Sequence, residues 1–153
     1  MKFSFASLAL AASTILATPS VAKKPYCPSR PATRAQQRAI FNEMLDTMLV
    51  SGTMADAARR HYAEDYIQHD PNVLSGRDAI VEYLENQPPG FNSTPINYGL
   101  DGDYAYLLLS VKIPEQEEMA WTDIWRFDGT CVVEHWSVYM TKPSNAINPL
   151  PLL

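Results

Sequence analysis

The hydrophobic pattern of this chain changes its period once, and that change limits the folds available to it. Before residue 87, apolar side chains recur every three or four residues, as on one buried helix face. After residue 94 they alternate, as in a strand with one buried face. Helices that precede a strand meander indicate an α+β fold with the helices packed on one face of an antiparallel sheet. The length, 153 residues, suits one such domain.

Three helices are expected before residue 87. Their predicted N-caps are Thr33, Thr53 and Ser75, and their predicted ends are Gly52, about Ala63, and Pro88-Pro89-Gly90. Asp78 would complete a capping box with Ser75. The first helix carries the clearest apolar face, made of Ile40, Phe41, Met44, Leu45, Met48 and Leu49. Residues 66–74 show no period and are expected to be irregular.

Four strands are expected after residue 94, at 96–100, 104–113, 119–127 and 131–141. Asp101-Gly102 and Asp128-Gly129 are turn signals, so they predict hairpins between neighbouring strands. The remaining residues, from Pro143 onward, are rich in proline and show no pattern. This tail is either free or folded over the mouth of a pocket.

The first 22 residues have the features of a secretory signal peptide. Lys2 precedes an apolar run over residues 3–17, and Ser20-Val21-Ala22 supplies the small residues of a cleavage site. The run is shorter than the roughly 20 residues of a membrane span, although an anchor or a buried helix is the alternative. The expected division is a signal peptide at 1–22, an arm at 23–32, the folded domain at 33–141 and a tail at 142–153. The product is then secreted.

Charge and composition narrow the partners. The chain has a net charge of −5, and loss of Lys2 with the signal peptide leaves 11 basic and 17 acidic residues, or −6. A pI near 5.1 argues against a nucleic-acid partner, which favours basic patches. No other stretch is long and apolar enough to span a bilayer, so no membrane partner is expected after signal cleavage.

Secretion also changes the interpretation of the two cysteines. In an oxidising compartment the pair Cys27 and Cys131 is expected to form a disulfide that pins the arm to the domain. A reactive thiol is the alternative, but it needs a nearby base and positive surroundings that the sequence does not show.

Asn92-Ser93-Thr94 is a glycosylation sequon in a turn-rich stretch, followed directly by Pro95.

The last predicted hairpin carries the side chains best suited to chemistry. Alternation places Trp121, Asp123, Trp125 and Phe127 on one face of its first strand, and Cys131, Val133, His135, Ser137 and Tyr139 on one face of its second. A two-residue loop, Asp128-Gly129, would set Asp123 opposite Glu134, with His135 on the other face. A three-residue loop would set Asp123 opposite Val133, with His135 as its same-face diagonal neighbour. We favour the second register, which avoids two facing carboxylates and keeps Arg126 and Glu134 on one face.

In that register Asp123 and His135 lie together among aromatic rings. A histidine held by a carboxylate in such a site can act as a general acid or base. A buried Asp–His hydrogen bond that only braces the hairpin is the equal alternative. His69, at a helix-to-loop junction before Asp70-Pro71, can assist catalysis or simply brace the loop. The three histidines lack the close spacing of a helical zinc pair, so no metal site is predicted.

Two segments together resemble a known family. YAEDYIQHDPNVLSGRDAIVEYL, at 62–84, is similar to the first half of SnoaL-like proteins of the nuclear-transport-factor-two-like superfamily, and DIWRFDGTCVVEHWSV, at 123–138, is similar to their last hairpin. The resemblance implies a cone-shaped curved antiparallel sheet wrapped by three N-terminal helices around a pocket. The family includes polyketide cyclases, dehydratases, isomerases, epoxide hydrolases and non-catalytic binding proteins. Its usual acid–base mechanism needs no metal or organic cofactor.

One residue departs from the family pattern. Relatives commonly carry an aspartate, the cyclases' general acid/base, where this chain has Ser137, and an alcohol cannot do that work at ordinary pH. Asp70, where relatives often have asparagine, can compensate.

The leading hypothesis is a secreted, cofactor-independent enzyme that cyclises, isomerises or dehydrates a hydrophobic, carbonyl-bearing, polyketide-like molecule. Asp123 and His135 would be the acid–base pair, with His69 assisting. Tyr66, Trp121, Trp125, Ser137 and Tyr139 would line the pocket. The runner-up is a secreted protein that binds a small molecule in the same pocket without catalysis. A homodimeric interaction module, using an open sheet face, is a third class that the sequence leaves open.

Overall fold

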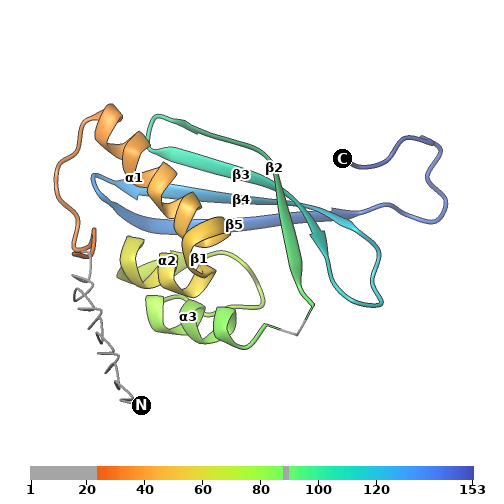
Figure 1. Ribbon diagram of the computed structural model, residues 1–153, viewed down its shortest axis with the longest axis horizontal. Coiled ribbons are helices and arrows are strands. Elements are labelled where there is room, and N and C mark those ends of the chain that lie inside the picture. Colours follow the sequence, from red (N-terminus) through yellow and green to blue (C-terminus); the bar gives the residue numbers. More distant parts are fainter. Residues whose placement is uncertain (1–23, 88–89) are drawn as a thin grey trace, which may run out of the picture.

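The structure is a computed structural model that describes residues 24–87 and 90–153. Within these residues two α-helices, a first strand, a third α-helix and four further strands follow one another, and the helices cover one face of the five-stranded sheet (Figure 1). The expected α+β fold is therefore confirmed. The expected signal peptide, 1–22, lies outside the described residues. In the described part of the chain, every helix is too short or too polar to cross a membrane.

The helices begin largely where their caps predict. Helix α1, Arg34–Asp46, starts after Thr33, whose hydroxyl accepts a hydrogen bond from the Gln36 amide while the Gln36 side chain accepts one from the Thr33 amide. It continues as a π-helical turn, η1, Thr47–Ser51, which ends before Gly52. Helix α2, Met54–His61, has the same reciprocal cap, between Thr53 and Asp56.

The third cap differs from the expectation. Helix α3, Arg77–Glu85, starts after Gly76, which has a φ of 101° and makes no side-chain cap. The Ser75 hydroxyl instead accepts a hydrogen bond from the Gln68 amide at 3.0 Å. The predicted Ser75–Asp78 capping box is therefore wrong, because Ser75 anchors the preceding strand to this turn.

The sheet contains one strand that the sequence pattern did not reveal. Strands β2, Asn92–Asp101, β3, Tyr104–Lys112, β4, Met119–Asp128, and β5, Cys131–Thr141, form the predicted antiparallel meander. Strand β1, Tyr62–Gln68, adds to β5 in parallel, so the order is β1-β5-β4-β3-β2 and the sheet is mixed. The expectation that residues 66–74 are irregular is therefore wrong for residues 66–68, which belong to β1. A bulge between Tyr62 and Ile67 interrupts the alternation that normally marks a strand.

The β4–β5 register is neither of the two considered. Asp128 pairs with Cys131 around Gly129-Thr130, and a register shift follows between Arg126 and Phe127. Beyond that shift Trp125 faces His135 and Asp123 faces Ser137. The favoured three-residue loop is therefore wrong, because the bulge moves the pairing further along β5. The expectation that Asp123 and His135 share a face as diagonal neighbours is confirmed, and Arg126 does lie opposite Glu134.

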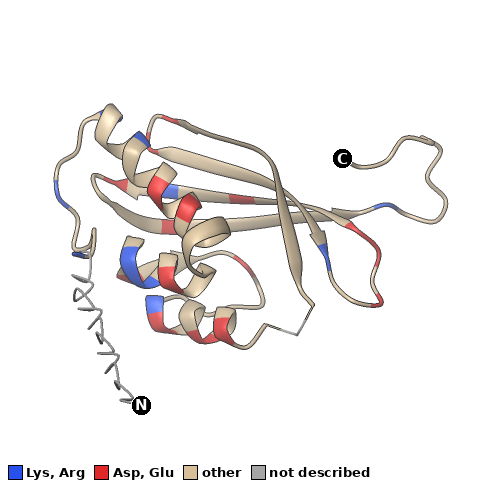
Figure 2. Cartoon of the chain, viewed as in Figure 1, with Lys and Arg blue, Asp and Glu red and all other residues tan. Residues whose placement is uncertain are grey.

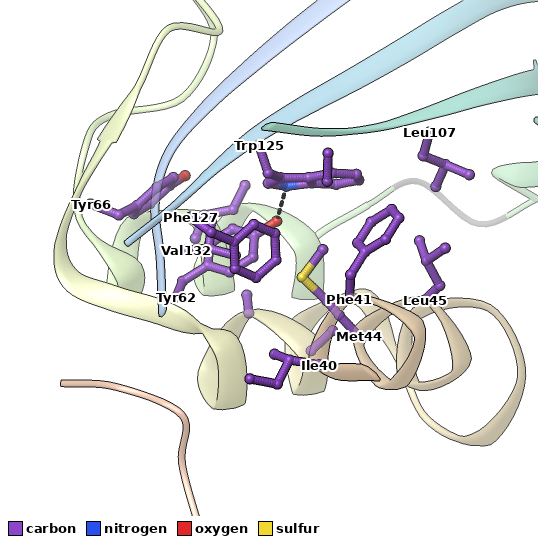
Figure 3. Close-up of a cluster of buried hydrophobic side chains, with 14 of the residues drawn as sticks. Ile40, Phe41, Met44, Leu45, Tyr62, Tyr66, Leu107, Trp125, Phe127 and Val132 are labelled. Carbon is purple, nitrogen blue, oxygen red and sulfur yellow. Dashed lines mark hydrogen bonds between the residues drawn. The ribbon is translucent and has the colours of Figure 1, made fainter. Parts of the chain in front are cut away.

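An aromatic core joins the helices to the sheet. Phe41 of α1 is fully buried and packs against Trp125 and Phe127 of β4, with ring centroids 6.2 and 6.4 Å away (Figure 3). Leu107 of β3 lies on the same sheet face, also without exposure. Most charged residues lie on the helices and in the turns, whereas the strands carry few (Figure 2). The helix-facing side of the sheet is consequently apolar enough to hold α1 against it.

The N-terminal arm is fastened to the β4–β5 turn. Cys27 and Cys131 form a disulfide with their Cα atoms 5.1 Å apart, as predicted. The Thr130 amide donates to the Arg30 carbonyl at 3.0 Å, and the Thr130 hydroxyl donates to the Tyr26 carbonyl at 2.6 Å. Gly129 has a φ of 52°, and a Cβ there would collide with the Arg30 backbone. The turn therefore needs glycine both for its conformation and for the approach of the arm.

Removal of this crosslink should destabilise the protein. The disulfide closes a loop with a sequence separation of 104 residues. Replacing both cysteines by alanine should lower the free energy of unfolding by about 2–5 kcal/mol, because the unfolded chain regains the entropy of the open loop. Urea unfolding monitored by circular dichroism measures this difference. Reduced wild-type protein should resemble the variant, and equal midpoints for the oxidised wild type and the variant would contradict the prediction.

Candidate functional site

A pocket lies between the helix-covered face of the sheet and the helices. It has an empty volume of about 640 Å³, counted out to its open mouth. Its apolar walls come from η1, α3 and strands β3 and β4, and include Met48, Leu84, Leu109, Val111, Trp121 and Trp125. Polar side chains also line it, among them Tyr62, Gln68, Asp70, Asp123, His135 and Ser137. An apolar pocket with a few convergent polar groups is the usual form of a small-molecule site.

Asp123 sits where three donors meet one carboxylate oxygen. Its Oδ1 accepts hydrogen bonds from Trp121 Nε1 at 2.9 Å and from Ser137 Oγ at 2.9 Å, and lies 3.2 Å from His135 Nε2. The β4–β5 register explains this convergence, because Ser137 faces Asp123 directly and His135 is its diagonal neighbour. Among the described residues, no hydrogen bond is made to the other oxygen, Oδ2. Asp123 therefore has one oxygen that is held and one that is free to act.

His135 is held from its other side by β1. Its Nδ1 lies 2.9 Å from Gln68 Oε1, and the same oxygen accepts the Asp70 amide at 3.0 Å. Gln68 Nε2 donates to the hydroxyl of Tyr66 at 2.9 Å, which fixes the orientation of the amide. Gln68 pairs with His135 across the parallel β1–β5 contact, so the strand missed by the sequence pattern orients the imidazole.

A second carboxylate lies at the pocket wall. Asp70 is buried, and its Oδ1 accepts hydrogen bonds from the Asn72 amide at 2.8 Å and the Asn72 side chain at 3.0 Å. This local turn holds the carboxylate at the end of β1, next to the Gln68 amide. The pocket therefore contains two carboxylates and one imidazole, and no lysine or arginine belongs to its described lining.

Tyr62 contributes a neutral hydroxyl. Trp125 Nε1 donates to Tyr62 Oη at 2.6 Å (Figure 3). Burial raises the pKa of Tyr62 well above its ordinary value, and the nearby charge of Asp123 raises it further. The predicted second helix, which ends at about Ala63, would have included Tyr62, whereas Tyr62 is the first residue of β1.

Three expected site residues lie outside the pocket lining. His69 is on the opposite sheet face, where its ring stacks on Trp136 with centroids 4.8 Å apart and its Nε2 lies 2.8 Å from Glu134 Oε1. Hydrogen bonds from His69 and from Arg126 hold the pKa of the Glu134 carboxyl below its usual value. Tyr66 is fully buried beneath Gln68, and Tyr139 is exposed and stacks on Trp121 with centroids 5.0 Å apart.

The other expected sites are spread over the molecule. The three histidines lie apart: His61 is buried beside Tyr26, His69 lies on the outer face and His135 lies in the pocket. In residues 24–87 and 90–153, no group of three or more histidine, cysteine or acidic side chains is arranged to hold a metal. Asn92 is exposed at the start of β2, where its glycosylation remains a prediction.

Sequence reasoning missed the polar groups Gln68 and Tyr62, which line the pocket from β1. Asp70, which it named only for its difference from the family pattern, lies two residues after this strand. The spacing of two between Gln68 and Asp70 is compatible with an extended segment, and it was the available signal. It was masked by the bulge and by a segment too short to show a convincing period.

Comparison with known proteins agrees with this architecture. The model of the SnoaL-like domain matches residues 34–135. Comparison with curated protein sequences gives no match. Among solved structures, a proposed ketosteroid isomerase from Kribbella flavida is 18% identical with a TM-score of 0.58, covering 76% of this chain and 84% of its own.

Two further structures are proposed polyketide cyclases. The protein from Acidithiobacillus ferrooxidans is 18% identical with a TM-score of 0.51, covering 71% of this chain and 90% of its own. The protein from a Jannaschia species is 11% identical with a TM-score of 0.55, covering 72% and 91%. At such low identities, these structural matches show a shared fold and nothing more. Because the family model matches two thirds of the chain, from α1 into β5, the chain belongs to the SnoaL-like family of the nuclear-transport-factor-two-like superfamily.

Proposed function

We propose that this protein is a secreted, cofactor-independent enzyme that moves a proton on a neutral, hydrophobic carbonyl compound. The reaction class is enolisation followed by isomerisation, ring closure or dehydration. The observation that carries the proposal is the convergence of Trp121, Ser137 and His135 on one oxygen of Asp123, with the second oxygen free in an apolar pocket.

The hydrogen-bond partners support an assignment of the protons in the pair Asp123 and His135. The Asp70 amide and the orientation of the Gln68 side chain make Gln68 Oε1 an acceptor, so His135 Nδ1 carries a proton. His135 Nε2 faces a carboxylate oxygen, so that contact also needs a proton to be a hydrogen bond. Two other donors already point at the same oxygen, so Asp123 Oδ1 is the acceptor of this contact. The bonded pair is then an imidazolium beside a carboxylate.

This arrangement assigns the chemical roles. Asp123 Oδ2 takes a proton from the carbon next to a bound carbonyl, and the electron pair of the broken C–H bond forms the enolate double bond. The carbonyl π pair moves to the oxygen. Asp123 then delivers the proton to another carbon, which gives isomerisation, or exchanges it with solvent before a proton returns to the same carbon, which gives exchange. His135 and Ser137 are positioning residues that hold Oδ1 while Oδ2 reacts.

The pocket lining supports a neutral substrate. Its walls are mainly aliphatic and aromatic, and Asp70 and Asp123 would repel a negatively charged ligand. Within the described lining, lysine and arginine are absent, so no cation is placed to pair with a phosphate or a carboxylate. A flat, uncharged polycyclic or aromatic ketone fits this surface best.

The departure at Ser137 is compatible with this mechanism. Ser137 donates a hydrogen bond to Asp123 instead of supplying a second carboxylate, so the acid–base role falls on Asp123.

The disulfide supports secretion, because such bonds persist in oxidising compartments.

Replacement of Asp123 or of His135 should slow proton transfer to a bound ketone. A suitable probe is 2-tetralone, an uncharged bicyclic ketone whose α-protons exchange with deuterium in D₂O and can be followed by NMR. Asp123→Asn should slow the catalysed exchange by about 10²–10⁴-fold, the usual contribution of a general acid or base. His135→Ala should slow it as well, because it removes the side chain that holds Asp123 Oδ1. Circular dichroism checks that each variant remains folded.

Two control variants sharpen this test. Asp65→Asn makes the same chemical change at an exposed position on β1, and His69→Ala removes a histidine from the outer face. Both should exchange within about twofold of the wild type, as surface changes away from the site do. Wild-type rates in Asp123→Asn and His135→Ala would refute the assignment.

The proton assignment can be tested without a substrate. ¹⁵N NMR of the histidine rings should show both nitrogens of His135 protonated in the wild type. In Asp123→Asn the new amide can donate to Nε2, so Nε2 should lose its proton while Nδ1 keeps its own, held by Gln68. An unprotonated Nδ1 in either protein would contradict the hydrogen-bond assignment.

A non-catalytic binding protein is the second candidate, and the Ser137 departure favours it. It predicts that ketones bind and return unchanged, and that Asp123→Asn weakens binding only modestly. Exchange of α-protons by the wild type, lost in Asp123→Asn, excludes this candidate.

A further inference from the structure

The hydroxyl of Tyr62 has a proton with no acceptor in the described part of the protein. Tryptophan Nε1 can only donate, so in the 2.6 Å contact with Trp125 the Tyr62 oxygen must be the acceptor. The hydroxyl proton therefore points elsewhere. Tyr62 is 4% exposed, and its hydroxyl makes no other hydrogen bond among residues 24–87 and 90–153.

This unpaired donor belongs to the pocket. Tyr62 is part of the same lining as Asp123, Gln68 and His135. Its ring is fixed from two sides, by the Trp125 hydrogen bond and by Tyr66, whose ring centroid is 5.1 Å away. A buried hydroxyl that is held rigidly but left without an acceptor is costly, unless a ligand supplies the acceptor. The direction left to its proton is the pocket that Tyr62 lines.

The ionisation of Tyr62 agrees with a donor role. Burial first, and the charge of Asp123 second, raise its pKa, so the phenol stays protonated and neutral. A neutral donor can hold a carbonyl oxygen in the ground state and strengthen its hydrogen bond as negative charge develops there. The Trp125 hydrogen bond to Tyr62 Oη polarises the same hydroxyl and makes it a better donor.

We propose that Tyr62 binds the carbonyl oxygen of the substrate and stabilises the enolate oxygen that Asp123 generates. This inference rests on the proposed acid–base function and names the group that recognises its substrate. During the step Tyr62 keeps its own proton: the α-proton moves from carbon to Asp123 Oδ2, and the charge that reaches oxygen is held by the Tyr62 hydrogen bond. The preferred ligand is thus an uncharged ketone or enone.

The carbonyl stretch of a bound ketone reports this hydrogen bond directly. The probe is 1-tetralone, and its binding is followed through the fluorescence of the pocket tryptophans, Trp121 and Trp125. In wild-type protein its C=O infrared band should fall below the frequency measured in hexane. Tyr62→Phe should return the band towards the hexane value and weaken binding about three- to tenfold. Tetralin, which has the same shape without oxygen, should bind both proteins within twofold.

A control variant makes the same chemical change away from the pocket. Tyr104→Phe removes the hydroxyl of an exposed tyrosine whose ring lies beside Trp136 on the open sheet face. The infrared band should keep its wild-type position in that variant. A band shifted equally by both variants, or unmoved by Tyr62→Phe, would overturn the role of Tyr62.

The wild type alone also decides the question if Tyr62→Phe does not fold. A wild-type band at the hexane frequency, or a failure of 1-tetralone to bind, would overturn the inference. Exchange of 2-tetralone protons separates it from the proposed function: Tyr62→Phe should lower kcat about 10²-fold and raise KM by no more than the roughly three- to tenfold loss of ketone binding. If exchange is lost in Asp123→Asn but kept in Tyr62→Phe, the acid–base function stands and the role of Tyr62 falls.

Discussion

The register of the β4–β5 hairpin is the constraint on which the site depends. Side chains alternate along a strand, so a slip of one residue would turn Asp123 or His135 to the opposite sheet face. The shift between Arg126 and Phe127 sets the pairing of Asp123 with Ser137 and of Trp125 with His135. The disulfide at Cys131 and the arm against Gly129 hold the turn where that register begins. Features far from the pocket thus determine what faces into it.

Trp125 links the hydrophobic core to the polar groups of the pocket. One side of its ring packs against Phe41 of α1, and His135 stacks on it with centroids 5.5 Å apart. Its indole nitrogen holds the hydroxyl of Tyr62. The same side chain therefore contributes to helix–sheet packing and orients two polar groups of the pocket. Preorganisation of this kind is what electrostatic catalysis requires, because the donors need not move when charge develops.

The two faces of the sheet use histidine in different ways. On the helix-covered face, His135 is enclosed between Gln68 and Asp123 and belongs to the pocket lining. On the open face, His69 pairs with Glu134 and stacks on Trp136, where solvent reaches it. Both histidines lie in motifs that resemble the family, yet alternation on β5 separates their partners, because Glu134 and His135 are consecutive residues.

Much of the fold could be predicted from local signals. The helical spacing of Ile40, Phe41 and Met44, and the reciprocal caps at Thr33 and Thr53, located α1 and α2 because capping and periodicity act within a few residues. Alternation and two Asp-Gly turns located β2–β5 in the same way. The identity of the pair Asp123 and His135 also followed from alternation. Strand β1 could not be found, because its bulge breaks the period and its pairing partner is about 70 residues away.

By itself, the sequence determined the order of the three helices and of strands β2–β5, the single disulfide pair and the chemical types available to a pocket, since these depend on composition and short-range pattern. Tertiary structure decided which polar groups meet. Gln68 reaches His135 only because β1 adds in parallel to β5, and Tyr62 reaches Trp125 only because that strand begins at the end of α2. Tertiary structure also placed His69 and His135 on opposite faces of the sheet. Such contacts depend on long-range pairing and on a bulge, and neither leaves a mark in the local spacing of residues.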